Sequence, residues 1–156
     1  MDTPMKQCIF IALCFLVNAS AFSSQAERPK IEHPIIGTWI FKLPNGCIET
    51  YDFKSDGTNY VTSSEEEGYD VYHASSTASP LGFYKLTDTI TQDNGKKDCS
   101  GSIMQLGHTA TNYIKLNPSN QMMVMCQTES FERCFGPLIR KQVPAPADQA
   151  ASKASE

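Results

Sequence analysis

The chain has 156 residues and a formal net charge of −4. The length suits one domain, and a chain with 40% hydrophobic and 19% charged residues is globular, which excludes disorder throughout. Because a nucleic-acid-binding surface needs a basic footprint, the acidic balance argues against a nucleic-acid partner.

Residues 1–26 are predicted to be a secretory signal peptide that is removed from the mature protein. Lys6 precedes an apolar run at residues 8–17, CIFIALCFLV, which is too short to span a bilayer. A small-x-small cleavage site lies at residues 24–26, with residues 19–21 as the second choice. An uncleaved N-terminal anchor is the alternative. Cleavage would leave no stable membrane span, and we expect a protein exported to the periplasm or the medium.

Residues 35–142 are expected to form an all-β domain, after a polar lead-in at residues 27–34. Turn signals rich in Pro, Asn, Asp and Gly separate short runs of aromatic and β-branched residues. The expected strands are 36–43, 47–53, 58–63, 69–74, 81–91, 98–106, 109–116, 121–128 and 135–141. The short connections predict an antiparallel sandwich or barrel. A disordered tail is expected at residues 143–156.

Four cysteines remain once Cys8 and Cys14 leave with the signal peptide. An even number of cysteines in an oxidising compartment predicts two disulfides. A four-thiolate zinc site is the alternative, but such sites usually show two closely spaced cysteine pairs, which this sequence lacks.

The residues Ile36-Gly37-Thr38-Trp39, followed by Tyr51-x-Phe53-x-x-Asp56-Gly57-Thr58, resemble the start of small bacterial lipocalin-like (calycin superfamily) domains. In that superfamily the tryptophan plugs one end of the barrel, and an arginine late in the chain stacks on it. The resemblance implies a single antiparallel up-and-down β-barrel of about eight or nine short strands. Trp39 and Arg140 would take those two structural roles, with the guanidinium within about 6 Å of the ring. The other interpretation is a core tryptophan in an unrelated barrel.

Strand parity predicts the pairing of the disulfides. Nine alternating strands place Cys47 and Cys99 at one end of the barrel, and Cys126 and Cys134 at the other. Bonded cysteines need Cα atoms within about 7 Å, so we expect Cys47–Cys99 and Cys126–Cys134. The second pair would lie directly opposite each other in a hairpin centred near Ser130. A miscount of one strand between Cys99 and Cys126 would place all four cysteines at one end.

The sequence carries no nucleophile elbow, zinc-protease helix or phosphate loop, so we expect no enzyme, no metal and no cofactor. Three weaker patterns each have a structural alternative. Ser100 and Ser102, near Asp98 with His73 or His108, would suit a hydrolase but are expected in turns. Met122, Met123 and Met125 would suit copper, although methionine on a buried strand mostly fills the core. Residues 65–67 with Asp70 are expected to form a solvated acidic loop, or a patch for a basic partner.

Glu49 alternates with Tyr51 and Phe53 and is therefore expected to face inward. A buried carboxylate must be paired, either with a lysine such as Lys85 or as the polar contact of a ligand pocket. The residues expected to line that pocket are Phe41, Glu49, Tyr51, Phe53, Tyr60, Tyr72, Phe83 and Tyr113.

The sequence is consistent with two main functions and a third, less specific one. The preferred one is an exported, non-enzymatic, calycin-like protein that binds a small apolar or amphipathic ligand. The alternative is a protein-binding module, either a hydrolase inhibitor or an immunity-type protein of the cell envelope, with contacts on loops 64–68, 74–80 and 129–133. A structural envelope protein is a third. An interior cavity of roughly 300 Å³ or more would favour the first, and a filled interior with exposed apolar loops the second. The sequence names neither ligand nor partner.

Overall fold

A computed structural model of the chain describes residues 32–142. The predicted signal peptide, most of the lead-in and the tail at residues 143–156 lie outside the described residues. The described part contains eight strands: β1 (Gly37–Lys42), β2 (Ile48–Phe53), β3 (Thr58–Ser63), β4 (Glu66–Ala74), β5 (Tyr84–Asp93), β6 (Thr109–Leu116), β7 (Met122–Cys126) and β8 (Cys134–Arg140). No helix within residues 32–142 is long and apolar enough to cross a membrane.

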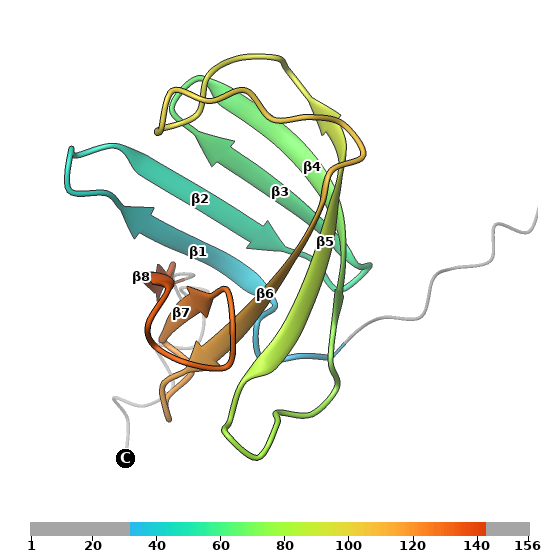
Figure 1. Ribbon diagram of the computed structural model, residues 1–156, viewed down its shortest axis with the longest axis vertical. Helices are drawn as coiled ribbons and strands as arrows, with labels where there is room; N and C mark the ends of the chain where they lie inside the picture. Colours follow the sequence, from blue (N-terminus) through green and yellow to red (C-terminus); the bar gives the residue numbers. More distant parts are fainter. Residues whose placement is uncertain (1–31, 143–156) are drawn as a thin grey trace, which may run out of the picture.

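The strands form a closed barrel in which each strand pairs with the next in the sequence (Figure 1). Every pairing is antiparallel, and β8 closes the barrel by pairing with β1. This up-and-down arrangement confirms the predicted fold class. Closure leaves no unpaired sheet edge and encloses the side chains of one face of every strand.

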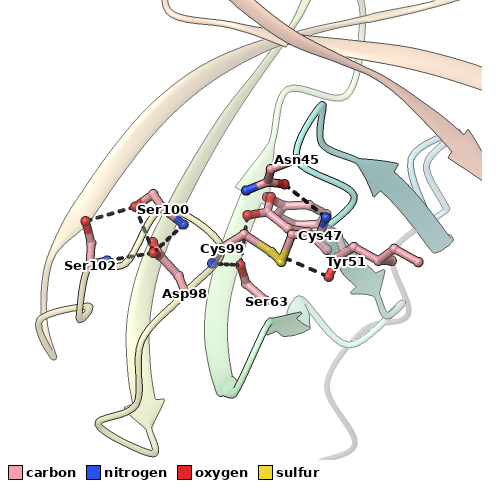
Figure 2. The surroundings of a disulfide bond; sticks show 10 residues. Asn45, Cys47, Tyr51, Ser63, Asp98, Cys99, Ser100 and Ser102 are labelled. Carbon is pink, nitrogen blue, oxygen red and sulfur yellow. Dashed lines mark hydrogen bonds between the residues drawn. A yellow bond between two sulfur atoms is a disulfide. The ribbon is translucent and has the colours of Figure 1, made fainter.

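The prediction of a strand at residues 98–106 is wrong. Residues 94–108 instead form turns and irregular chain between β5 and β6, the long excursion at the top of Figure 1. The cause is local, because the Asp98 carboxylate accepts hydrogen bonds from the backbone N–H groups of Ser100 and Ser102, both at 2.8 Å (Figure 2). Side chains that bond neighbouring backbone groups in this way compete with strand formation.

Trp39 fills one end of the barrel, which we call the closed end. It is fully buried, and its indole N–H donates to the carbonyl of Ile35 at 2.7 Å. The Arg140 guanidinium carbon lies 4.2 Å from the ring centroid, as predicted. The remaining core at this end comes from residues of several strands, among them Phe53, Tyr72, Leu86, Ile114, Met123 and Leu138.

Arg140 also ties the lead-in and a hairpin to this end. It is the register partner of Trp39 where β1 and β8 close the barrel. Its guanidinium group donates to the carbonyls of Pro34, of Ile36 at 2.6 Å and of Asn120 at 2.7 Å. Gly37 makes room for it, since a Cβ there would lie 2.6 Å from Nη1. These contacts explain why glycine and tryptophan occur together at the start of β1.

Both predicted disulfides, Cys47–Cys99 and Cys126–Cys134, are confirmed. The parity argument for them is wrong, because the missing strand at residues 98–106 places all four cysteines at the same end of the barrel. Cys126 and Cys134 are cross-strand partners in the β7–β8 hairpin, as expected. Cys47–Cys99 instead ties the 94–108 segment to the start of β2 (Figure 2). Two disulfides are consistent with an oxidising environment.

Candidate functional site

The barrel encloses a cavity of about 370 Å³, towards the end that carries the Cys47–Cys99 disulfide. All strands contribute side chains to its wall, and the 94–108 segment adds Asp98, Met104 and His108. That segment is held in place because Cys99 is bonded to Cys47 and its backbone N–H donates to the Ser63 hydroxyl at 2.9 Å (Figure 2). The disulfide therefore fixes part of the cavity wall.

Four of the eight predicted lining residues line this cavity: Phe41, Glu49, Tyr51 and Phe53. They come from β1 and β2, where strict alternation places every second side chain inside. The hydrophobic pattern was sufficient here because these two strands contain no bulge and pair in continuous register.

The other four, Tyr60, Tyr72, Phe83 and Tyr113, do not line it. Tyr60 and Tyr113 alternate with residues that do, so they lie on the outer face, where Tyr60 stacks on Tyr69 at 4.8 Å. Tyr72 is buried in the closed end, edge-on to Phe53, and its hydroxyl donates to the carbonyl of Lys54 at 2.7 Å. Phe83 precedes β5 and packs against Phe131 at 5.6 Å. Aromatic residues therefore occupy both faces of this barrel.

Glu49 faces inward with identified partners. Its carboxylate accepts hydrogen bonds from the Tyr51 hydroxyl at 2.7 Å and from the Ser63 hydroxyl at 2.8 Å. The prediction that Lys85 pairs with Glu49 is wrong, since the Lys85 side chain is exposed. Burial and the negative charge of Glu49 raise the pKa of Tyr51 far above its usual value, so Tyr51 remains a hydrogen-bond donor.

The acidic residues after Ser64 are not a solvated loop. Strand β4 begins at Glu66, and its inward residues are Glu66, Gly68, Asp70 and Tyr72. Glu66 is only 5% exposed and Asp70 only 8%. The expectation of a solvated patch is therefore wrong for these two carboxyl groups, although Glu65 and Glu67 are exposed. The i, i+2 spacing of these residues is a signal of one shared strand face, but because carboxylates are rarely buried the composition favours a solvated loop.

A β-bulge brings a further carboxylate inside. Tyr69 pairs with Gln92 but Asp70 pairs with Ile90, which leaves Thr91 as the extra residue. Both Ile90 and Asp93 consequently line the cavity. Simple alternation along β5 cannot place both inside, so no sequence pattern indicated Asp93.

Glycine at position 68 suits this bulge. Gly68 is the register partner of Asp93, and a Cβ at Gly68 would lie 3.1 Å from the carbonyl oxygen of Gln92. The absence of a side chain lets β5 approach β4 closely and leaves the space beside Asp93 open.

Six carboxyl groups line the cavity: Glu49, Glu66, Asp70, Asp88, Asp93 and Asp98. The lining contains His108, but none of the described lining residues is a lysine or an arginine. The same lining contains apolar side chains, chiefly Phe41, Phe53, Leu86, Met125 and Phe135. The site thus combines an apolar surface with a concentration of acidic groups.

The acidic groups of the cavity raise one another's pKa values. Burial, followed by the charges of Asp93 and Asp98, raises the pKa of Glu66 to about 7. Burial, followed by the charge of Asp70, raises the pKa of Asp88 to about 6. Burial also raises the pKa of Asp70. The site therefore opposes full ionisation of its own carboxyl groups near neutral pH.

Asp98 behaves differently. Burial pushes its pKa upward, but hydrogen bonds from Ser100, Ser102 and Gly101 outweigh that effect, and the net pKa is lowered. Ser100 donates to this carboxylate at 2.7 Å (Figure 2). Both serines thus stabilise a turn, which is the structural role expected for them.

Three acceptor atoms of the cavity are buried without a hydrogen-bond partner: Asn59 Oδ1, Asp88 Oδ1 and Asp93 Oδ2. Asn59 is 3% exposed, and its amide nitrogen donates to Asp70 at 3.2 Å. Its carbonyl oxygen is left over. Buried polar atoms without partners are rare in native proteins, so each one is available to accept a hydrogen bond from a molecule bound in the cavity.

Two of the three methionines of β7 fill the core. Met123 and Met125 are buried inside the barrel, whereas Met122 faces outward and is exposed. Within residues 32–142, no three His, Cys, Asp or Glu side chains are grouped so that they could hold a metal ion.

The raised carboxyl pKa values predict that the barrel is more stable at pH 5.5 than at pH 8. Glu66 and Asp88 retain protons in the folded state up to about pH 7 and pH 6, but lose them near pH 4 when unfolded. In this window the folded state binds more protons, so stability falls as pH rises. We expect a melting temperature several degrees higher at pH 5.5, since about 1 kcal/mol moves it by about 4–8 °C.

A matched pair of variants isolates the effect from other titrating groups such as His33, whose pKa is lowered by burial. Glu66→Gln should raise the melting temperature at pH 8. It should also reduce the difference in melting temperature between pH 5.5 and pH 8. The neighbouring Glu67→Gln, on the outer face, should do neither. The groups that face Glu66 are Glu49 from β2, Asp93 from β5 and Asp98 from the 94–108 segment. A Glu66→Gln protein less stable than the wild type at pH 8 would contradict this account.

Comparisons with protein-family models, curated proteins and solved structures find no significant match to this chain. The chemistry of the cavity is therefore the basis on which its function is inferred.

Proposed function

We propose that this chain is an exported, non-enzymatic, calycin-like protein that binds a small amphipathic ligand inside its barrel. The observation that carries the proposal is the cavity of about 370 Å³, whose lining combines apolar residues with carboxyl groups. Binding sites for small molecules typically have volumes of about 300–1,000 Å³ and combine apolar walls with a few polar groups.

The cavity volume of about 370 Å³ indicates the size of the ligand. This suits a molecule with one ring or a short alkyl chain, and it is small for a membrane lipid. The two disulfides and the predicted signal peptide support export, and the disulfide-bonded 94–108 segment supports a wall that keeps its shape when a ligand enters.

The protein-binding alternative keeps one supporting observation. Phe131, in the expected contact loop 129–133, is 67% exposed. Exposed aromatic side chains on rigid loops are typical anchors of protein interfaces. The interior cavity, however, favours the small ligand.

Native mass spectrometry of the protein, exported and purified with its disulfides intact, tests the proposal. A noncovalent small-molecule adduct is expected on the wild type. Ala110→Phe should lose the adduct, because Ala110 lines the cavity and a phenyl group would fill it. Thr111→Phe, at the next position and exposed, is the matched control and should keep it. A stoichiometric protein adduct would support the alternative. If the wild type and both variants all carry no adduct, the proposal is overturned.

A further inference from the structure

The acidic groups of the cavity are concentrated on neighbouring strands. Glu66 and Asp70 lie on β4, Asp88 and Asp93 on β5, and all four line the cavity. We call these four residues the acidic wall. Lysine and arginine are absent from the described lining, so no fixed positive charge faces the acidic wall from within the cavity. A desolvated carboxylate is stabilised only by a nearby cation or by hydrogen-bond donors.

The unpartnered atoms lie in the same place. Asp88 Oδ1 and Asp93 Oδ2 belong to the acidic wall, and Asn59 Oδ1 belongs to the residue that donates to Asp70. Asn59 itself is 97% buried, as follows from its 3% exposure. All three atoms are acceptors. An ammonium group brings a positive charge and three N–H donors, so it matches both these acceptors and the charge of the acidic wall.

We infer that the ligand of this cavity is a small protonated organic amine. Its ammonium group lies against the acidic wall and against the carbonyl oxygen Oδ1 of Asn59. Its apolar body lies against Phe41, Phe53 and Met125. The inference rests on the proposed function and names the chemical class of its ligand.

The arrangement favours an organic cation over a metal ion. Calcium requires six to eight oxygen atoms arranged around one point. Here apolar side chains occupy a large part of the lining, and the cavity has room for a molecular body beside the charge. The raised pKa values of Glu66 and Asp88 agree with a site in which burial and the charges of neighbouring carboxylates outweigh the attraction of His108 for Asp88. A bound ammonium would lower them and release protons to the solvent.

Isothermal titration calorimetry with three probes of similar shape tests the inference. The probes are 2-phenylethylamine, 2-phenylethanol and 3-phenylpropanoate, which carry a cation, a neutral hydroxyl and an anion on the same ring. At pH 8 the amine is expected to bind at least tenfold more tightly than the alcohol, and the carboxylate is expected not to bind. At pH 6.5, titration in buffers of different ionisation enthalpy should show release of protons when the amine binds.

Glu66→Gln and Glu67→Gln form the matched pair of variants. Glu66→Gln should weaken binding of the amine at least tenfold and leave binding of the alcohol within about twofold. Glu67→Gln, on the outer face of the same strand, should bind all three probes like the wild type. Equal losses for amine and alcohol in Glu66→Gln would mean that Glu66 is only structural, and would overturn the inference.

The remaining outcomes separate the two proposals. If the alcohol or the carboxylate binds as tightly as the amine, or if calcium displaces the amine by direct competition, the cavity is not an amine site but still binds a small ligand or ion. If no probe binds, the proposed function fails as well.

Discussion

Replacing Trp39 with alanine is expected to lower the free energy of unfolding by about 3–5 kcal/mol, the range measured for large aromatic side chains in cores. The side chain is fully buried at the closed end of the barrel. Its removal leaves a cavity, breaks the hydrogen bond to Ile35 and removes the ring on which Arg140 stacks. Because the closed end holds most of the hydrophobic core, the loss is not confined to one strand.

Urea unfolding followed by far-UV circular dichroism measures this change. Fluorescence is unsuitable for the variant because Trp39 is the single tryptophan of the chain. Trp39→Phe is the matched control, since it retains most of the buried area and a ring for Arg140 but loses the N–H donor. It should lose roughly half as much stability or less. A loss below about 1 kcal/mol for Trp39→Ala would show that the closed end does not hold the barrel together.

The barrel itself was predictable from the sequence because two local signals agreed. Turn residues such as Asp56-Gly57 separate the strands, and alternation in β1 and β2 places Trp39, Phe41, Glu49 and Phe53 inside. Consistent local signals of this kind are what make a sequence specify one fold. The strand expected at residues 98–106 failed where that agreement breaks, since the Asp98 carboxylate redirects the backbone through hydrogen bonds that no periodicity shows.

The candidate site was predictable only in part, for a different reason. The sequence predicts a mainly aromatic lining, but Tyr60 and Tyr113 lie on the outer face, and the inner face of β4 carries Glu66 and Asp70 instead. Asp93 depends on the bulge at Thr91, which alternation cannot foresee. The residues that give this cavity its chemistry are therefore those that violate the usual rule of polar side chains outside.

This violation has an energetic consequence for the whole molecule. Carboxyl groups such as Glu66 and Asp88 oppose folding when they are ionised, so the empty barrel is less stable than its hydrophobic core would allow. The closed end at Trp39 and the two disulfides offset that loss. Destabilising groups that are kept in an otherwise well-packed protein are typical of functional sites, because function and stability place different demands on the same residues.

Removing the Cys47–Cys99 disulfide is expected to have both a structural and a functional effect. The bond closes a loop of 52 residues, and the chain-entropy model assigns such a loop about 4 kcal/mol of stabilisation. The Cys126–Cys134 bond spans only 8 residues, and the same model gives about 2.5 kcal/mol. Cys47→Ala with Cys99→Ala should therefore destabilise the protein more than Cys126→Ala with Cys134→Ala.

Alanine is the appropriate replacement in both double variants, because Cys126 is buried and a serine hydroxyl there would add a desolvation penalty. Urea denaturation of the oxidised proteins gives the two free energies of unfolding. Equal losses, or a larger loss for the Cys126–Cys134 pair, would contradict the loop-length argument.

Ligand binding should separate the two bonds further. Cys47–Cys99 holds the segment that supplies Asp98, Met104 and His108 to the cavity, whereas Cys126–Cys134 closes a hairpin. Without the first bond the segment is held less firmly, although the backbone N–H at position 99 still donates to Ser63, and its ordering upon binding reduces affinity. Titration with 2-phenylethylamine under conditions where both double variants are folded should show at least a several-fold weaker affinity for the first and little change for the second. Equal affinities would mean that the segment keeps its position without the bond, and that the disulfide serves stability alone.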